Sequence, residues 1–155
     1  MSEVEKRMEK HGIILPLRDR RGTGVVDAVL LEDVLYLSAH LPVDTEGKPL
    51  YVGKVGAELD VEAAYKAARQ CGLNMLATIK DHIGGLDRVD YVVKALGLIN
   101  SAGDFSQQPA VMNGFSDLMV EVFGRRGQHA RSAMGAYALP MNVPVVVDAI
   151  VRVRR

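Results

Sequence analysis

The sequence predicts an α+β fold in which one mixed β-sheet carries two helices on a single face. Strand and helix patterns follow one another in the order β-β-α-β-α-β-β, and helices interleaved with strands in this way pack together against one sheet. The last segment, VPVVVDAIV, is apolar on both sides of the strand pleat. The second face of the sheet therefore needs cover, and another copy of the chain is the simplest candidate.

Length and charge narrow the class of protein. The 155 residues are enough for one domain with a buried core. Lys and Arg together number 19, as do Asp and Glu, and this balance argues against general electrostatic binding of nucleic acid or membranes. No apolar run is long enough to span a bilayer, and the charged N-terminus lacks the apolar core of a signal peptide. With Cys71 as its only cysteine, the chain is expected to be cytoplasmic.

The N-terminal half is assigned from hydrophobic periodicity and turn residues. Residues 3–11 suit a short amphipathic helix, and residues 18–24 an arginine-rich turn. Residues 25–44 read as a hairpin broken at residues 31–33. In its second strand, alternation places Leu35, Leu37 and Ala39 on one face.

The C-terminal half continues with the longest helix, which is capped by Asp60 and ends at Gly84. A strand over residues 89–100 is expected to turn one face to the core, with Val89, Tyr91, Val93, Ala95 and Ile99 on it. Pro109 fits the first position of a second helix that ends at Gly124, with Asn113 off its apolar stripe. A second hairpin, turning at Pro140 and Asn142, closes the chain.

Arg131 begins the first strand of that closing hairpin. Arginine is rarely buried without an anionic partner. From the residues alone, this partner is either a carboxylate elsewhere in the protein or the anionic group of a ligand.

Three stretches together resemble the YjgF/Rid family, the reactive intermediate deaminases that are also named endoribonuclease L-PSP. They are LYLSAHLPVD, MNGF and ARSAMGAYALPMNVPVVVDAIVRV, of which the last is the most specific. The resemblance covers residues 25–155 and leaves residues 1–24 as an N-terminal extension with a short helix. It implies a chorismate-mutase-like fold and a homotrimer with ligand clefts between subunits. It also implies a small carboxylate, imino acid or keto acid as ligand, with neither cofactor nor metal.

The resemblance also assigns residues to the cleft. Arg131 matches the arginine that holds the substrate carboxylate, and a guanidinium can bind a carboxylate through two parallel hydrogen bonds. Asn113 matches an asparagine of the same cleft, and Ser38 a serine near the other end of the ligand. The positions around them are expected to contact the ligand as well: Ala39, Ser132, Ala133 and Val146.

Three departures from the family pattern bear on the reaction. Val146 stands where deaminating members carry a glutamate that is thought to position the attacking water, and valine can neither accept a proton nor orient water. Asp148 lies about 7 Å further along the same strand. The pattern glycine after Ser38 is Ala39, and the pattern cysteine is Ala133.

The family pattern therefore leaves the acid–base group unassigned, and the candidates for it are His129, His40 and Asp148. The spacing of the histidines suggests no metal site. One hypothesis is an imine or enamine deaminase, a hydrolase with a non-standard water-activating group. The alternative is a non-catalytic metabolite-binding or regulatory protein that uses the same cleft. An endoribonuclease or translation inhibitor is a weaker alternative, because the sequence offers no acid–base pair for phosphodiester cleavage.

Overall fold

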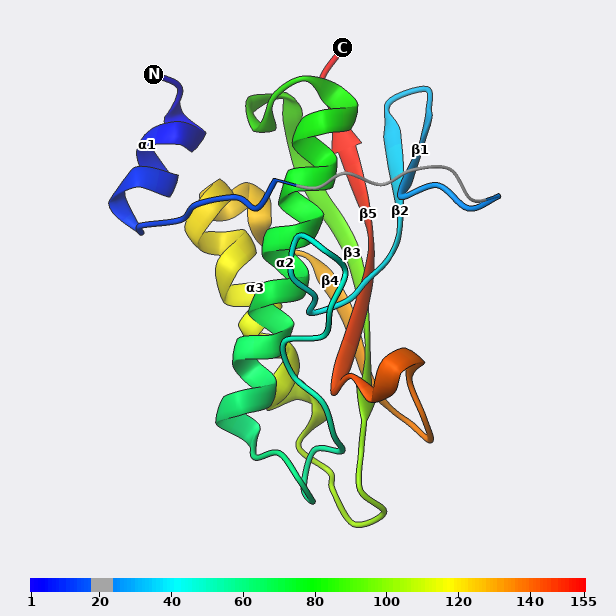
Figure 1. Ribbon diagram of the computed structural model, residues 1–155. Helices are drawn as coiled ribbons and strands as arrows, with labels where there is room; N and C mark the ends of the chain where they lie inside the picture. Colours follow the sequence, from blue (N-terminus) through cyan, green and yellow to red (C-terminus); the bar gives the residue numbers. More distant parts are fainter. Residues whose placement is uncertain (18–23) are drawn as a thin grey trace.

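A computed structural model describes residues 1–17 and 24–155 (Figure 1). The predicted turn at residues 18–24 lies outside this range except for Gly24. The helices and strands are α1 (Glu3–Lys10), β1 (Ala28–Leu31), β2 (Val34–His40), α2 (Val61–Ile83), β3 (Val89–Asn100), α3 (Gln108–Phe123), β4 (Ala130–Ala136) and β5 (Val145–Val153). Three short 3-10 turns join them, η1 (Leu86–Arg88), η2 (Gly124–Gly127) and η3 (Pro140–Asn142).

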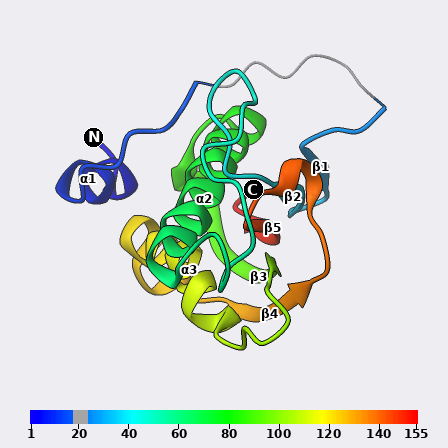
Figure 2. The ribbon, with the colours of Figure 1, turned by 60° about the horizontal axis from the view of Figure 1, so that its bottom comes forward.

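The sheet has the strand order β1-β2-β5-β3-β4. Its neighbouring strands run antiparallel except β3 and β4, which are parallel, so the sheet is mixed. Helices α2 and α3 lie on the same side of it, and α3 runs beside the edge strand β4 (Figure 2). The predicted α+β class with two helices on one face is confirmed.

The prediction of a closing hairpin is wrong, because β4 and β5 are not paired with each other. β3 lies between them and pairs with both, parallel to β4 and antiparallel to β5. The turn at η3 only redirects the chain, with Met141 and Asn142 both at a φ of 54°. Which strands become neighbours depends on a third strand about 40 residues earlier, and turn residues carry no information about it.

Close packing between α2 and α3 fixes where α3 lies over the sheet. The Asp60 side chain caps α2 by accepting from the Ala63 amide at 2.8 Å, and Gly84 ends the helix at a φ of 81°. At Gly114 of α3 the two helices touch backbone to backbone, since a Cβ atom there would lie 2.0 Å from the Tyr65 carbonyl oxygen. The helix that carries Asn113 is thus held against α2.

Two irregularities change which strand residues face the core. The pairing of β3 with β5 shifts register near its start, so Val92 is buried, whereas Val93, predicted to be buried, is 43% exposed. A register shift between Leu37 and His40 similarly turns His40 inward and leaves Ala39 exposed. Simple alternation fails at both places because a bulge adds a residue to one strand.

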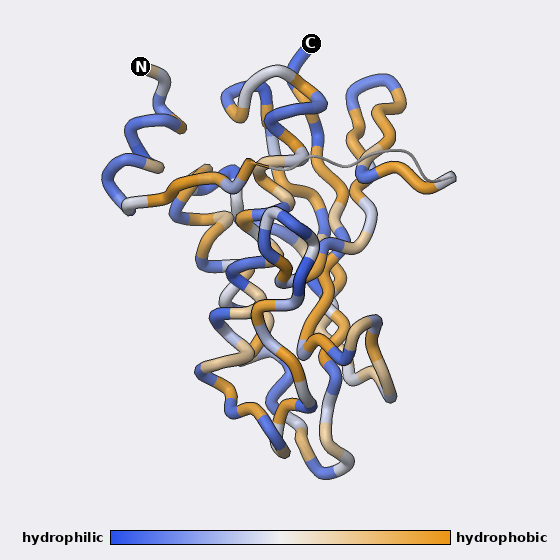
Figure 3. Tube along the Cα trace, in the orientation of Figure 1, coloured by the Kyte–Doolittle hydropathy of each residue, from blue (hydrophilic) through white to orange (hydrophobic). Residues whose placement is uncertain are grey.

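The sheet face turned away from the helices, here called the open face, has apolar side chains as predicted. Alternate residues of β5 lie in the core beneath the helices, among them Val147 and Ala149, so Val146, Asp148 and Ile150 point to the open face. Strand register places exposed apolar residues on the same face: Val29 (54%), Leu31 (62%), Tyr36 (46%) and Met134 (59%). Figure 3 shows how hydrophobic the strands of the β1–β2 hairpin are on both sides of its hydrophilic turn.

The N-terminal helix α1 packs against α3. Ser2 and Glu5 cap it reciprocally, and its Val4 side chain is buried in the main core. The predicted short helix is therefore confirmed, with an apolar contact that ties it to the rest of the fold. The division of the chain into an extension and a domain at residue 24 stays a prediction.

Candidate functional site

Arg131 lies on the edge strand β4 and its side chain points toward α3. It pairs in register with Ala95, which is buried beneath the helices. Its guanidinium Nη1 donates to Asn113 Oδ1 at 2.8 Å and to Ser116 Oγ at 3.1 Å, while Nη2 contacts the Pro109 carbonyl oxygen at 3.5 Å. Arg131 and Asn113, which the resemblance places in one cleft, are thus in direct contact.

All of these acceptors are neutral. Within residues 1–17 and 24–155, no carboxylate forms an ion pair with Arg131. The side chain is half-buried, so its positive charge is partly removed from water without compensation from a protein anion. Such a group favours an anion that approaches from outside the chain.

His129, a candidate acid–base group, lies behind Arg131. Its Nδ1 is 2.7 Å from the Gly127 carbonyl oxygen, its Nε2 is 2.9 Å from Ser116 Oγ, and its ring meets Phe115 edge to face. Burial lowers the pKa of His129 below its ordinary value, and the Arg131 charge lowers it further, against the opposing effect of the Gly127 hydrogen bond. The imidazole is therefore neutral at pH 7.

The lowered pKa of His129 predicts a loss of stability in mild acid. The unfolded chain takes up a proton on this residue near its ordinary pKa of 6.5, while the folded protein resists it, so the free energy of unfolding falls as the pH drops below that value. His129→Phe keeps the ring volume and removes the titration. Urea unfolding between about pH 7.5 and about pH 5.5 is expected to show a smaller loss for His129→Phe than for the unaltered protein. Equal losses in both would contradict a half-buried imidazole that resists protonation.

A second group of predicted site residues lies on the open face. Val146 and Asp148 point there from β5, and the Ser38 hydroxyl donates to the Val26 carbonyl oxygen at 2.7 Å. Burial raises the pKa of Asp148, and the nearby Lys94 partly opposes this. Ser132 also points to the open face, from β4.

The chain does not bring these two groups together. β2 and β4 are separated by β5 and β3, so Ser38 and Arg131 are about 14 Å apart across the sheet at the ordinary strand spacing. Val146 lies on the opposite face from Arg131. Ala133 shares the side of Arg131 and packs against the core.

The structure argues against His40 as the acid–base group. It is fully buried, with Nδ1 at 2.7 Å from the Ser38 carbonyl oxygen and Nε2 at 2.8 Å from Thr78 Oγ1 on α2. Both ring nitrogens thus hold the bulge of β2 against the helix. A side chain closed off from solvent in this way cannot reach a ligand, so its role is structural. The neighbouring Ala39, by contrast, is exposed and available for contact.

Cys71 is buried, as predicted, with its Sγ 3.6 Å from the Val145 carbonyl oxygen. The described residues contain no group of three or more His, Cys, Asp or Glu side chains placed to hold a metal ion. In the same residues no helix is long and apolar enough to cross a membrane.

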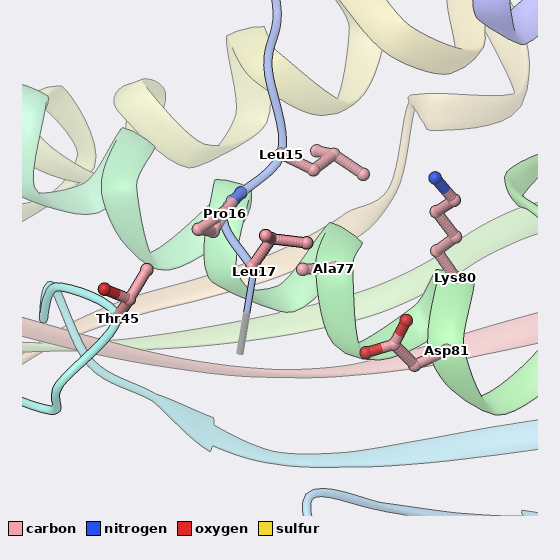
Figure 4. A pocket seen from close by; sticks show the side chains of 7 residues that line it. All are labelled: Leu15, Pro16, Leu17, Thr45, Ala77, Lys80 and Asp81. Atoms are coloured by element: carbon pink, nitrogen blue, oxygen red, sulfur yellow. The ribbon is translucent and has the colours of Figure 1, made fainter. Parts of the chain in front are cut away.

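A hollow of about 520 Å³ lies between the N-terminal segment and α2. Its lining is Leu15, Pro16, Leu17, Thr45, Ala77, Lys80 and Asp81 (Figure 4). Lys80 and Asp81 lie at one side and Thr45 at the other, with apolar side chains between them. None of the residues that the sequence assigned to a ligand lines this hollow.

Comparison with known proteins decides the family. The model of the family described as "YjgF/chorismate mutase-like, putative endoribonuclease" matches residues 24–152. The chain belongs to this family. Protein TCP17 of Trypanosoma cruzi is 38% identical over 149 residues, which make up 96% of this chain and 92% of that protein.

Two solved structures share the fold of this chain. Protein Atu1372 of Agrobacterium tumefaciens, of unknown function, is 36% identical with a TM-score of 0.89, covering 98% of this chain and 92% of its own. A "putative endoribonuclease" of Shewanella oneidensis is 28% identical with a TM-score of 0.91, covering 98% of this chain and all of its own. The YjgF-type, chorismate-mutase-like fold that the sequence resemblance implied is therefore confirmed.

Proposed function

We propose that the protein binds a small carboxylate of the keto acid or imino acid class, with Arg131 as the anchor. The observation that carries the proposal is a half-buried guanidinium whose acceptors in the described chain are all neutral. The resemblance to YjgF/Rid proteins, in which the matching arginine holds a carboxylate, supports the same role. Calorimetric titration with 2-oxobutyrate and benzoate tests it.

The binding site is completed by a neighbouring copy in a homotrimer. Ser38, Ala39 and Val146 lie on the open face, far from Arg131 of the same chain, so a cleft holding both groups needs residues from two subunits. The exposed apolar side chains of the open face supply the surface for this contact. β4, which carries Arg131 and Ser132, lies at the edge of the sheet, where a second subunit can approach it.

Sedimentation equilibrium is expected to give three times the chain mass of 16.9 kDa. The burial of the apolar open face drives this association, so the mass should not fall at high salt. As a control, Tyr36→Lys places a charge on the open face and should weaken the assembly. A monomer mass for the unaltered protein would contradict a binding site formed between subunits.

The bound acid is held without deamination, because Val146 replaces the glutamate that the family pattern assigns to the attacking water. Asp148, the nearest carboxylate on that face of β5, is displaced by about 7 Å along the strand. The purified protein is therefore expected not to accelerate hydrolysis of freshly generated iminopropionate over buffer. A deaminating member of the family, assayed in parallel, serves as the positive control. Acceleration that disappears in Arg131→Ala would show that the same site is an enzyme.

A further inference from the structure

A chain of hydrogen bonds behind Arg131 is not used by the proposed function. It runs from the Gly127 carbonyl oxygen to His129, from His129 to Ser116 and from Ser116 to Arg131, with separations of 2.7, 2.9 and 3.1 Å. It connects η2, β4 and α3. The family pattern and the apolar spacing of α3 assign no role to Ser116.

The direction of each hydrogen bond follows from what each group can donate. A carbonyl oxygen only accepts, so Nδ1 of His129 carries the hydrogen toward Gly127. In a neutral imidazole Nε2 is then bare and accepts the hydroxyl hydrogen of Ser116. This fixes the Ser116 oxygen with its lone pairs toward Arg131, whose Nη1 can only donate.

One side of the guanidinium is left for a ligand. Nη1 has two hydrogens, and Asn113 Oδ1 and Ser116 Oγ take one each. Nη2 has only the long contact to the Pro109 carbonyl oxygen, and within the described residues Nε has no acceptor. The Nε hydrogen and one of the two Nη2 hydrogens are thus left, and donors on these two neighbouring nitrogens can bind both oxygens of a carboxylate.

We propose that Asn113, Ser116 and His129 form a clamp that holds Nη1 of Arg131 and presents its Nε–Nη2 edge to a carboxylate. This inference rests on the proposed function and adds Ser116 and His129 to the site as positioning residues. It also changes the role of Asn113, whose amide oxygen is committed to the arginine. The clamp raises the affinity for the carboxylate by preorganisation, because a guanidinium that is already fixed in place loses less conformational freedom when the ligand binds.

Ser116→Ala tests the clamp, with Ser116→Thr as the conservative control that keeps the hydroxyl. Loss of one hydrogen bond to a charged group is expected to weaken benzoate binding about tenfold in Ser116→Ala. Ser116→Thr should restore most of the affinity. His129→Phe, which keeps the ring and removes its nitrogens, should cause a smaller loss and provides a second test if Ser116→Ala does not fold.

NMR of the protein with nitrogen-15-labelled arginine detects whether the Arg131 guanidinium is held in place when no ligand is bound. Restrained rotation should give separate Nη1 and Nη2 signals for Arg131 in the unaltered protein and in Ser116→Thr, and one averaged signal in Ser116→Ala. Unchanged signals and unchanged benzoate affinity in Ser116→Ala would overturn the clamp and leave the proposed function standing. Separate signals that Ser116→Ala averages, in a protein that binds no carboxylate, would instead support the clamp and overturn the proposed function.

Discussion

Replacing Arg131 by alanine is expected to abolish binding of 2-oxobutyrate and benzoate while the assembly and fold remain. The guanidinium supplies the positive charge and two parallel donors, and each hydrogen bond to a charged group contributes about 1.5 to 3 kcal/mol. Their loss should weaken binding by about a hundredfold or more. Calorimetry measures the affinity, and sedimentation shows whether the assembly is intact.

Two further variants separate the anchor from a general charge effect. Arg131→Lys keeps the charge but loses the planar pair of donors, so it should recover only part of the affinity. Arg125→Ala removes the same charge from an exposed position on η2 and should bind as the unaltered protein does. Full affinity in Arg131→Ala would show that the arginine serves the structure alone.

Gly114→Ala is expected to be the most damaging single-methyl change in α3. Its Cβ would lie 2.0 Å from the Tyr65 carbonyl oxygen and 3.2 Å from the Arg69 amide nitrogen, and both are backbone atoms of α2. The helices can accept the methyl group only by moving apart, which costs about 3 kcal/mol. Urea unfolding at a fixed protein concentration measures the loss.

Gly103→Ala is the matched control for this prediction. A Cβ atom at Gly103 would have no heavy atom within 4 Å, and its backbone is not left-handed. Its free energy of unfolding should change by no more than about 0.5 kcal/mol. If Gly114→Ala were equally mild, α2 and α3 could not be in backbone contact at this point.

The sequence predicts the parts of the fold that depend on neighbouring residues. α2 begins and ends where Asp60 and Gly84 indicate, because capping is a local interaction. The pairing of β4 with β3 instead of β5 depends on contacts between distant segments, and a turn between two apolar strands does not reveal it. The inward turn of His40 follows from a bulge, which leaves no mark in the alternation of β2.

The candidate site could also be predicted only in part. Arg131 and Asn113 follow from the family resemblance, and they are in contact. The sequence analysis does not predict Ser116 of the proposed clamp, although it lies three residues after Asn113 and hence on the same side of a helix. That spacing was available in the sequence. The separation of Ser38 and Val146 from Arg131 was not, because it depends on the strand order.

A crystal structure of the protein with benzoate tests the central claim most directly, namely that Arg131 anchors a carboxylate between two copies of the chain. We expect the carboxylate on the Nε–Nη2 edge of Arg131, with Asn113 and Ser116 on Nη1 and the open face of a neighbouring subunit as the opposite wall. An Asp or Glu side chain of the assembly paired with Arg131 in place of the ligand would contradict the claim and show a structural ion pair.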